Sequence, residues 1–185
     1  MNKTCVFIIG TNCSGKSTLV KELIRRFGGV LSSDKWITEV KNGCFCIAGK
    51  YTAGSRYGGI DGWGEVKPLQ SVVERAFKTH DVIICEGVKL HSVGPALSNA
   101  LYVANNRLVC FLYAPAEILN QRLNERSGGQ ISLAILKDQQ ACARSLNRWA
   151  KIGGVSVMHC DTSVMSVEEC ADALIDRINK LRING

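Results

Sequence analysis

The chain has 185 residues, of which 46% are hydrophobic and 21% are charged, so we expect one globular domain with its own core. No apolar run approaches the ~20 residues that span a bilayer, the N-terminal run is too short for a signal peptide, and nine scattered cysteines fit a reducing compartment, so we expect a cytoplasmic protein without disulfides. The excess of 23 Lys and Arg over 16 Asp and Glu gives a net charge of +7, which favours anionic partners.

Short apolar, β-rich runs alternate along the chain with segments of helical periodicity. The runs predict five strands, at residues 4–9, 30–33, 82–85, 108–113 and 155–160. The periodic segments predict six helices, at residues 16–27, 68–78, 95–104, 116–126, 132–152 and 166–181. Strands that alternate with helices predict a parallel sheet covered on both faces. The expected fold class is therefore α/β: a single three-layer domain over residues 1–185, with a five-stranded parallel sheet that binds ligands at the carboxyl ends of its strands.

The stretch of residues 36–67 does not follow this alternation. It is rich in glycine, has no clear period, and contains one candidate edge strand at residues 44–48. A long irregular segment inside a compact domain is usually functional or disordered. Its tryptophans and tyrosines argue against plain disorder, so we expect this segment to contribute to a binding site.

The sequence GTNCSGKST lies between the first strand and the first helix. Its spacing, Gly10 followed by four residues and then Gly15-Lys16-Ser17, is the P-loop pattern in the context that the pattern requires. Glycines allow backbone N–H groups to surround phosphates, and the helix that follows adds the positive end of its dipole. We expect Lys16 to reach the outer phosphates and Ser17 to bind Mg²⁺. The residues expected to hold ATP are Gly10, Thr11, Asn12, Cys13, Ser14, Gly15, Lys16, Ser17 and Thr18.

The remaining motifs separate switches, motors and kinases of this superfamily. A GTPase needs D-x-x-G after its third strand and N-K-x-D for guanine; Asp61-Gly-Trp-Gly64 fits the first pattern without a strand before it, and the second pattern does not occur. Motor ATPases usually have longer chains. The sequence therefore favours a small phosphotransferase with the P-loop fold of nucleoside and nucleotide kinases, which passes the γ-phosphate of ATP to an alcohol.

Two acids end predicted strands and are candidates for the chemistry. Asp34 follows the second run, in LSSDKW, and is a candidate catalytic base that holds the acceptor hydroxyl; a turn or cap aspartate is the structural alternative. Glu86 ends the third run, in VIICEG, as a Walker B carboxylate does, and is a candidate ligand of Mg²⁺. Glu86 can also be the base and Asp34 the residue that holds the substrate.

Arginines after the fourth strand predict a small lid at about residues 122–135. Arg122 and Arg126 lie one helical turn apart, and the Ser-Gly-Gly sequence after them predicts a hinge, so a closing lid would bring an arginine over the phosphates. The alternative is a solvated arginine face. Helix 132–152 carries a row of cations opposite its apolar face, which predicts a solvated face, arginines that touch ATP, or a track for a nucleic-acid backbone. The row consists of Lys137, Arg144, Arg148 and Lys151.

The middle segment resembles a known family. The run Tyr51-Thr-Ala-Gly-Ser-Arg-Tyr-Gly-Gly-Ile-Asp-Gly, a helix, and then Val-Ile-Ile-Cys-Glu-Gly-Val resemble the P-loop kinases of bacteriophages with hypermodified thymines. The match covers residues 5 to about 90. Members of that family phosphorylate 5-hydroxymethyluracil bases within DNA, using ATP. The resemblance implies DNA containing 5-hydroxymethyluracil as the partner, ATP and Mg²⁺ as cofactors, the host cytoplasm as the location, and residues 36–67 as the acceptor-binding segment.

The same resemblance implies a pocket for the acceptor base, shaped by Tyr57, Gly58, Gly59 and Asp61 with Asp34. Glycines let a flat base approach the backbone, a tyrosine can stack on it, and an aspartate can accept a hydrogen bond from it. A base inside a duplex would have to be flipped out to reach such a pocket. The residues leave open a kinase for a nucleoside, nucleotide or sugar acid, a polynucleotide 5′-hydroxyl kinase, and a module that senses ATP without catalysis.

Overall fold

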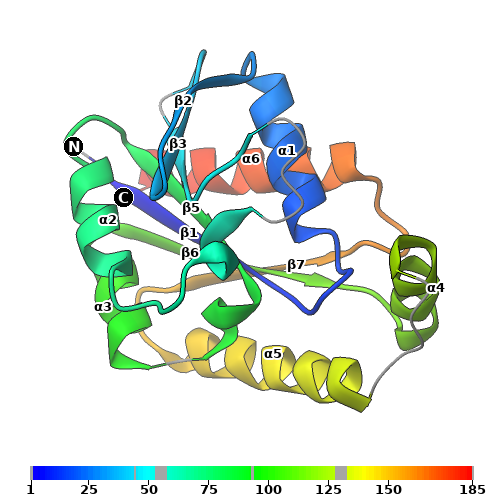
Figure 1. The fold of residues 1–185 in the computed structure, drawn as a ribbon. Helices are drawn as coiled ribbons and strands as arrows, with labels where there is room; N and C mark the ends of the chain where they lie inside the picture. The colour runs from blue at the N-terminus through cyan, green and yellow to red at the C-terminus, as the bar shows by residue number, and fades with distance from the viewer. Residues whose placement is uncertain (1, 44, 53–57, 93, 128–132, 185) are drawn as a thin grey trace.

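The computed structural model describes residues 2–43, 45–52, 58–92, 94–127 and 133–184 (Figure 1). The strands are β1 (Thr4–Ile9), β2 (Val30–Ser33), β3 (Ile37–Val40), β4 (Phe45–Ala48), β5 (Val82–Glu86), β6 (Asn106–Tyr113) and β7 (Ser156–Asp161). The α-helices are α1 (Lys16–Arg26), α2 (Leu69–Ala76), α3 (Pro95–Tyr102), α4 (Ala116–Ser127), α5 (Leu133–Lys151) and α6 (Val167–Asn184). Two short 3₁₀ helices, η1 (Gly59–Gly62) and η2 (Val88–His91), complete the described elements.

All strands join one sheet in the order β2-β3-β4-β5-β1-β6-β7. The five strands from β4 to β7 in that order are mutually parallel, with β1 between β5 and β6. Strand β3 runs antiparallel to β4, and β2 runs antiparallel to β3. The α/β class, the parallel core and all six predicted helices are confirmed.

The predicted strand count is wrong, because the described part of the chain has seven strands and not five. The run at residues 30–33 does not belong to the parallel core but forms the outer strand of the β2–β3 hairpin. Its place beside β5 is taken by β4, which the sequence presented as an edge strand and which is in fact fully buried. Four-residue strands give too short a pattern to rank, and strand order depends on contacts between distant segments.

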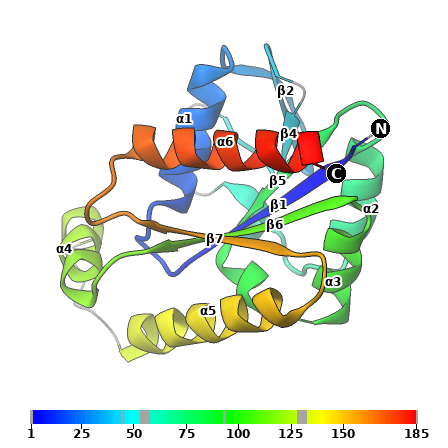
Figure 2. The ribbon, with the colours of Figure 1, turned by 180° about the vertical axis from the view of Figure 1, so that it is seen from behind.

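Alternate residues of the parallel strands pack into two separate cores. On one face, Phe7 of β1 meets the edge of the Trp149 ring of α5 at a centroid distance of 6.1 Å, within the core under α2, α3 and α5. On the other face, Val6 and Ile8 pack under α1 and α6. Figure 2 shows α1 and α6 together on that second face. The result is the predicted three-layer arrangement. No helix within the described residues is long and apolar enough to cross a membrane.

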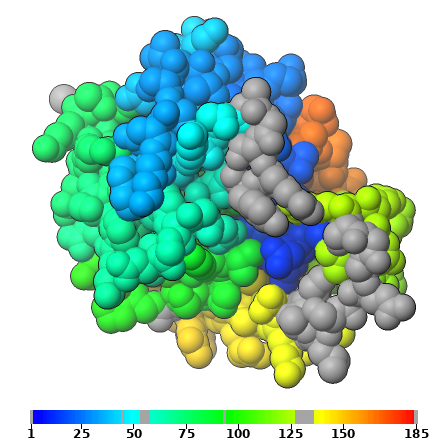
Figure 3. Space-filling view, viewed as in Figure 1, coloured from blue at the N-terminus to red at the C-terminus, as the bar shows by residue number. Residues whose placement is uncertain are grey.

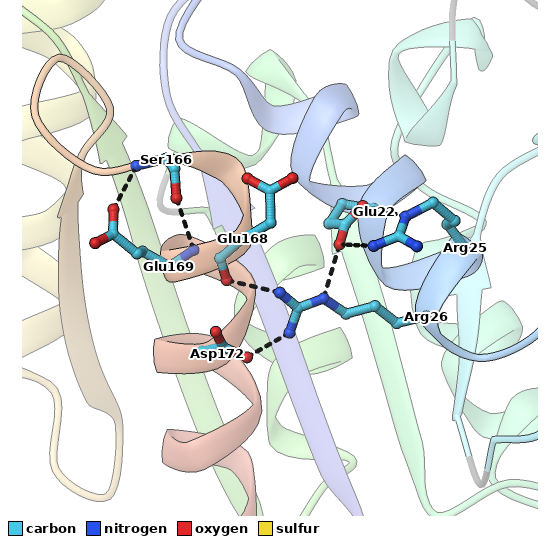
Figure 4. A network of polar contacts seen from close by, with 7 residues as sticks. All are labelled: Glu22, Arg25, Arg26, Ser166, Glu168, Glu169 and Asp172. Atoms are coloured by element: carbon cyan, nitrogen blue, oxygen red, sulfur yellow. Dashed lines mark hydrogen bonds and ion pairs between the residues drawn. The ribbon is translucent and has the colours of Figure 1, made fainter.

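Helices α1 and α6 are also joined by a polar network (Figure 4). The buried carboxylate of Glu22 accepts hydrogen bonds from Arg25 and Arg26 at 2.7 and 2.8 Å. Arg26 continues to Asp172 of α6 and to the backbone carbonyl of Glu168. These two donors hold the pKa of Glu22 at about 2, far below its ordinary value.

A capping box begins α6 in the same network. The Glu169 carboxylate accepts a hydrogen bond from the Ser166 N–H at 2.7 Å, and the Ser166 hydroxyl accepts one from the Glu169 N–H at 3.1 Å (Figure 4). The network therefore fixes the start of α6 relative to α1, whose first residues belong to the phosphate loop.

Candidate active site

The carboxyl ends of β5, β1, β6 and β7 meet at one edge of the sheet. The register pairs Ile8 with Glu86, and Tyr113 with Asp161, so the segments that follow these strands begin side by side. Parallel α/β sheets bind ligands at this edge. The P-loop, Glu86 and residue Thr162 after β7 are all brought together here.

The phosphate loop has the backbone that the P-loop pattern requires. Gly10, Cys13 and Gly15 have φ values of 155°, 62° and 92°, so the chain turns through the left-handed region three times in six residues. A methyl group on Gly10 would lie 2.6 Å from the carbonyl oxygen of Leu112, so only glycine fits there. Gly15 is the N-cap of α1 and provides no side-chain cap, and the first turn contains no acidic residue. The positive end of α1 is thus left for an anion.

Lys16 is buried at the first position of α1, where its ammonium donates a hydrogen bond to the Thr11 carbonyl at 2.8 Å. Burial lowers the pKa of Lys16, and the negative charges of Glu86 and Asp61 oppose this shift. A phosphate chain in the loop would give this buried cation its counter-charge, which is the usual role of a P-loop lysine.

Glu86 is 1% exposed at the end of β5, and one of its carboxylate oxygens accepts two hydrogen bonds. Ser17 donates at 3.1 Å and the hydroxyl of Tyr51 donates at 2.5 Å to this Oε1 atom. Burial raises the pKa of Glu86, while Lys16 and the two hydroxyl donors counteract the shift. Tyr51 was not singled out as a site residue by its sequence position, because its contact with Glu86 joins segments that are 35 residues apart.

The Ser17 hydroxyl and the Glu86 carboxylate form a donor set that fits Mg²⁺. The second oxygen of Glu86, Oε2, is buried and has no hydrogen-bond partner among the described residues. Mg²⁺ prefers oxygen ligands and is usually held by one or two protein oxygens together with substrate phosphates. A cation at Glu86 would compensate this carboxylate as a phosphate would compensate Lys16.

Asp61 lies in η1, opposite the phosphate loop. Its two oxygens accept hydrogen bonds from the backbone N–H groups of Val88 and Lys89 at 2.9 and 3.3 Å, so it caps the start of η2. It remains partly exposed, unlike Glu86. Gly58, just before η1, is in close contact with the Tyr51 ring: a methyl group there would lie 2.4 Å from a ring carbon. Asp61 and Gly58 are thus held in place from behind.

A cavity of about 540 Å³ lies between these groups, and we call it the first cavity. It is lined on one side by the phosphate loop and on the other by Gly58 and Asp61. In the space-filling view, the deep-blue segment that contains the phosphate loop reaches the surface between the green segment and yellow-green α4 (Figure 3). The volume and the mixed polar and apolar lining suit a nucleotide.

Both predicted lid arginines line the first cavity. Arg122 is partly buried and donates hydrogen bonds to the Thr162 hydroxyl at 2.9 Å, to the Thr162 carbonyl at 2.5 Å and to the Cys13 carbonyl at 3.4 Å. It therefore ties α4 to the phosphate loop and to the segment after β7. Arg126 lies one turn further along α4 and is exposed.

Residues at the start of α6 form the apolar end of the first cavity and were not predicted from the sequence. They are Met165, Ser166, Val167 and Cys170. The one available signal was their position directly after the last parallel strand, since the residues themselves belong to no nucleotide-binding pattern. The capping box at Ser166 fixes this wall of the cavity.

The structure places Asp34 away from the first cavity, which corrects the expectation that it lies across from the phosphate loop. It follows β2, three strands from β1, and its Oδ1 accepts hydrogen bonds from the N–H groups of Trp36 and Ile37 at 2.6 Å. Burial opposes ionisation of Asp34, but these donors and Arg75, 3.1 Å away, lower its pKa. Asp34 is the turn aspartate of the structural alternative.

Some predicted residues lie outside the described part of the chain. Tyr57 is one, and the hinge glycines Gly128 and Gly129 are others. The cation row on α5 is exposed at all four of its positions, while Cys142, Leu146 and Trp149 on the opposite face are buried. The described residues that line the first cavity include no member of this row, so it is a solvated face there.

No family model and no curated protein match this sequence. Solved structures do match it. The YorR protein of Bacillus subtilis, in complex with phosphorylated GDP, has a TM-score of 0.58 at 15% identity and covers 95% of this chain and 96% of its own. A gluconokinase from Sinorhizobium meliloti 1021 has a TM-score of 0.54 at 14% identity, with 98% and 94% covered. Deoxyadenosine kinase from M. mycoides, with products dCMP and dCDP, has a TM-score of 0.52 at 11% identity, with 95% and 99% covered.

The chain has the α/β fold of P-loop kinases. At these identities the likeness concerns the fold alone, over nearly the whole length of each chain. It agrees with the sheet order and the phosphate loop described above.

Proposed function

We propose that this protein is an ATP-dependent phosphotransferase that passes the γ-phosphate to an alcohol. The observation that carries the proposal is the first cavity, in which a P-loop with an uncapped helix N-terminus, a buried lysine and a buried carboxylate face a partly exposed aspartate. Donor and acceptor sites for a phosphoryl group thus lie on opposite walls of one space.

Each side chain has a role that its contacts support. Lys16 and the N–H groups at the start of α1 bind the outer phosphates, and Arg122 and Arg126 face the same cavity from α4. Ser17 and Glu86 would hold Mg²⁺, which supplies charge neutralisation at the transferring phosphate when bound. The nucleoside end fits the apolar wall at Met165 and Cys170 of the first cavity.

Asp61 is our candidate for the group that accepts the proton of the acceptor hydroxyl. It lines the first cavity opposite Lys16 and is accessible, whereas Glu86 is turned toward Ser17 and Tyr51 and Asp34 lies elsewhere. A general base must reach the proton that it removes, so position decides between the three acids.

The acceptor that we favour is the hydroxymethyl group of 5-hydroxymethyluracil in DNA. The glycines and the aspartate of the Gly58-Gly59-Ile60-Asp61 block lie at the wall of the first cavity, where a flat base could approach the backbone. The net charge of +7 supports an anionic polymer. A base in a duplex would enter only after flipping.

A small alcohol is the second candidate, supported by the fold shared with a gluconokinase and a deoxyadenosine kinase. Radiolabelled ATP with 5-hydroxymethyluracil DNA, unmodified DNA, the free nucleotide, the nucleoside and gluconate separates the candidates. We expect label in the modified polymer. Label only in small molecules would transfer the function to the second candidate, and label in unmodified DNA would indicate a 5′-hydroxyl kinase. ATP binding without any transfer would leave an ATP-sensing module.

A further inference from the structure

A second cavity of about 310 Å³ lies behind η1, on the side of the β2–β3 hairpin. Its lining consists of Asp34, Lys35, Lys50, Gly59, Gly62 and Trp63. In Figure 3 the light-blue hairpin lies against the turquoise segment that holds η1. The Trp63 ring N–H donates to the Lys35 carbonyl at 3.2 Å, and the Trp36 and Trp63 rings pack edge to face at 5.0 Å. The cavity therefore has a fixed aromatic base.

The charges at the second cavity favour an anion. Its lining carries two lysines against one carboxylate, and that carboxylate is already bonded to Arg75 and to two backbone N–H groups. Lys50 is exposed and forms no hydrogen bond or ion pair with the described residues. The Lys35 ammonium lies over the Trp36 ring at 4.5 Å, which leaves its hydrogen-bond donors available.

More positive charge surrounds this lining. Lys89 donates from its ammonium to the carbonyl oxygens of Trp63 and Gly64, directly beside the cavity. The nearby Glu65 is paired with Lys67 at 3.2 Å. The cavity is thus electropositive on the hairpin side and on the η1 side, which is the arrangement that binds a phosphate.

A single turn of chain separates the two cavities. Gly58 and Asp61 line the first, while Gly59 and Gly62 of the same turn line the second. The turn is fixed from both sides: a methyl group on Gly59 would lie 2.3 Å from the Glu86 carbonyl, and one on Gly49 would lie 2.2 Å from the Gly59 carbonyl. A ligand whose reactive part enters the first cavity can therefore place a neighbouring group in the second.

We propose that the second cavity binds a phosphate group of the acceptor, through Lys35 and Lys50. The inference rests on the proposed function, and it narrows the acceptor to a phosphate-bearing nucleotide, either free or within a strand, rather than a neutral nucleoside or sugar. The same chemistry serves a 5′-phosphate of a mononucleotide and a phosphodiester of single-stranded DNA.

The test compares the double variant Lys35→Gln/Lys50→Gln with the control Lys41→Gln/Lys78→Gln. The control removes two exposed lysines from the opposite end of the sheet and so causes the same change in net charge. Binding is measured without ATP, by anisotropy of a labelled single-stranded oligonucleotide containing 5-hydroxymethyluracil, between 50 and 200 mM salt. Transfer is then measured with the oligonucleotide, the mononucleotide and the nucleoside.

We expect the site variant, but not the control, to lose affinity and to reduce the salt slope by about 0.7 for the phosphate released. Its KM for phosphate-bearing acceptors should rise about tenfold, with KM for ATP and for the nucleoside unchanged. A KM rise with the mononucleotide assigns the site to the acceptor's own phosphate, and a rise with the oligonucleotide alone assigns it to a neighbouring diester. Equal slopes and KM values in the two variants, or a wild-type protein that neither binds the oligonucleotide nor prefers the mononucleotide to the nucleoside, overturn the proposal. If the wild type transfers to no acceptor, the proposed function fails, while the anisotropy slopes still decide the phosphate site.

Discussion

Replacing Gly59 by alanine tests the turn on which both cavities depend. Gly59 has a φ of 65°, and an added methyl group would lie 2.3 Å from the Glu86 carbonyl oxygen and 2.6 Å from Glu86 Oε1. The left-handed backbone alone costs an alanine about 1–2 kcal/mol. Overpacking against a backbone atom, which no rotamer change relieves, adds about 1–3 kcal/mol. We therefore expect Gly59→Ala to lower the free energy of unfolding by about 2–5 kcal/mol.

Gly62→Ala is the matched control for this substitution. Gly62 lies in the same turn, and a methyl group there meets no atom within 4 Å among the described residues, so the cost should stay within about 0.5 kcal/mol. In a domain of this size 1 kcal/mol shifts Tm by about 2–4 °C, which gives a decrease of about 4–20 °C for Gly59→Ala and under about 2 °C for the control. Circular dichroism melts and urea titrations measure both. If the two variants melt within 1 °C of each other, the packing of η1 against Glu86 is refuted.

Three further substitutions test individual contacts. Lys16→Ala should reduce phosphoryl transfer by about a hundredfold or more while leaving the fold, because it removes a phosphate contact and no core group; near-normal turnover, relative to the exposed control Lys21→Ala, would contradict the kinase proposal. Tyr51→Phe removes a donor to the Glu86 carboxylate, so the pKa of Glu86 should rise, the acidic limb of the rate profile should move to higher pH, and turnover should fall about tenfold or more; an unmoved limb would leave Tyr51 a packing residue. Glu22 has its pKa lowered from 4.5 to about 2, so its contribution to stability is present above pH 4.5 and is lost as the pH falls toward 2. The Tm difference between wild type and Glu22→Gln should therefore be largest at pH 6 and shrink between pH 5 and pH 3; a constant difference would show that the network with Arg25 and Arg26 does not depend on this charge.

Local patterns determined much of this protein. The alternation of apolar runs with helical segments predicted the three layers and all six helices, because each pattern reflects burial of neighbouring residues on one face. The spacing from Gly10 to Ser17 predicted the phosphate loop, since that backbone path depends on glycines within the loop itself. Glu86 was found by the same kind of reasoning, as an acid that directly ends a buried strand.

Tertiary structure decided what lies opposite the loop. Strand order placed β4 and not β2 beside β5, which moved Asp34 to a hairpin turn at the second cavity and left Asp61 at the first. The contact of Tyr51 with Glu86 and the wall from Met165 to Cys170 join segments far apart in the chain. Such contacts depend on how distant faces pack, and no short stretch of sequence records that packing.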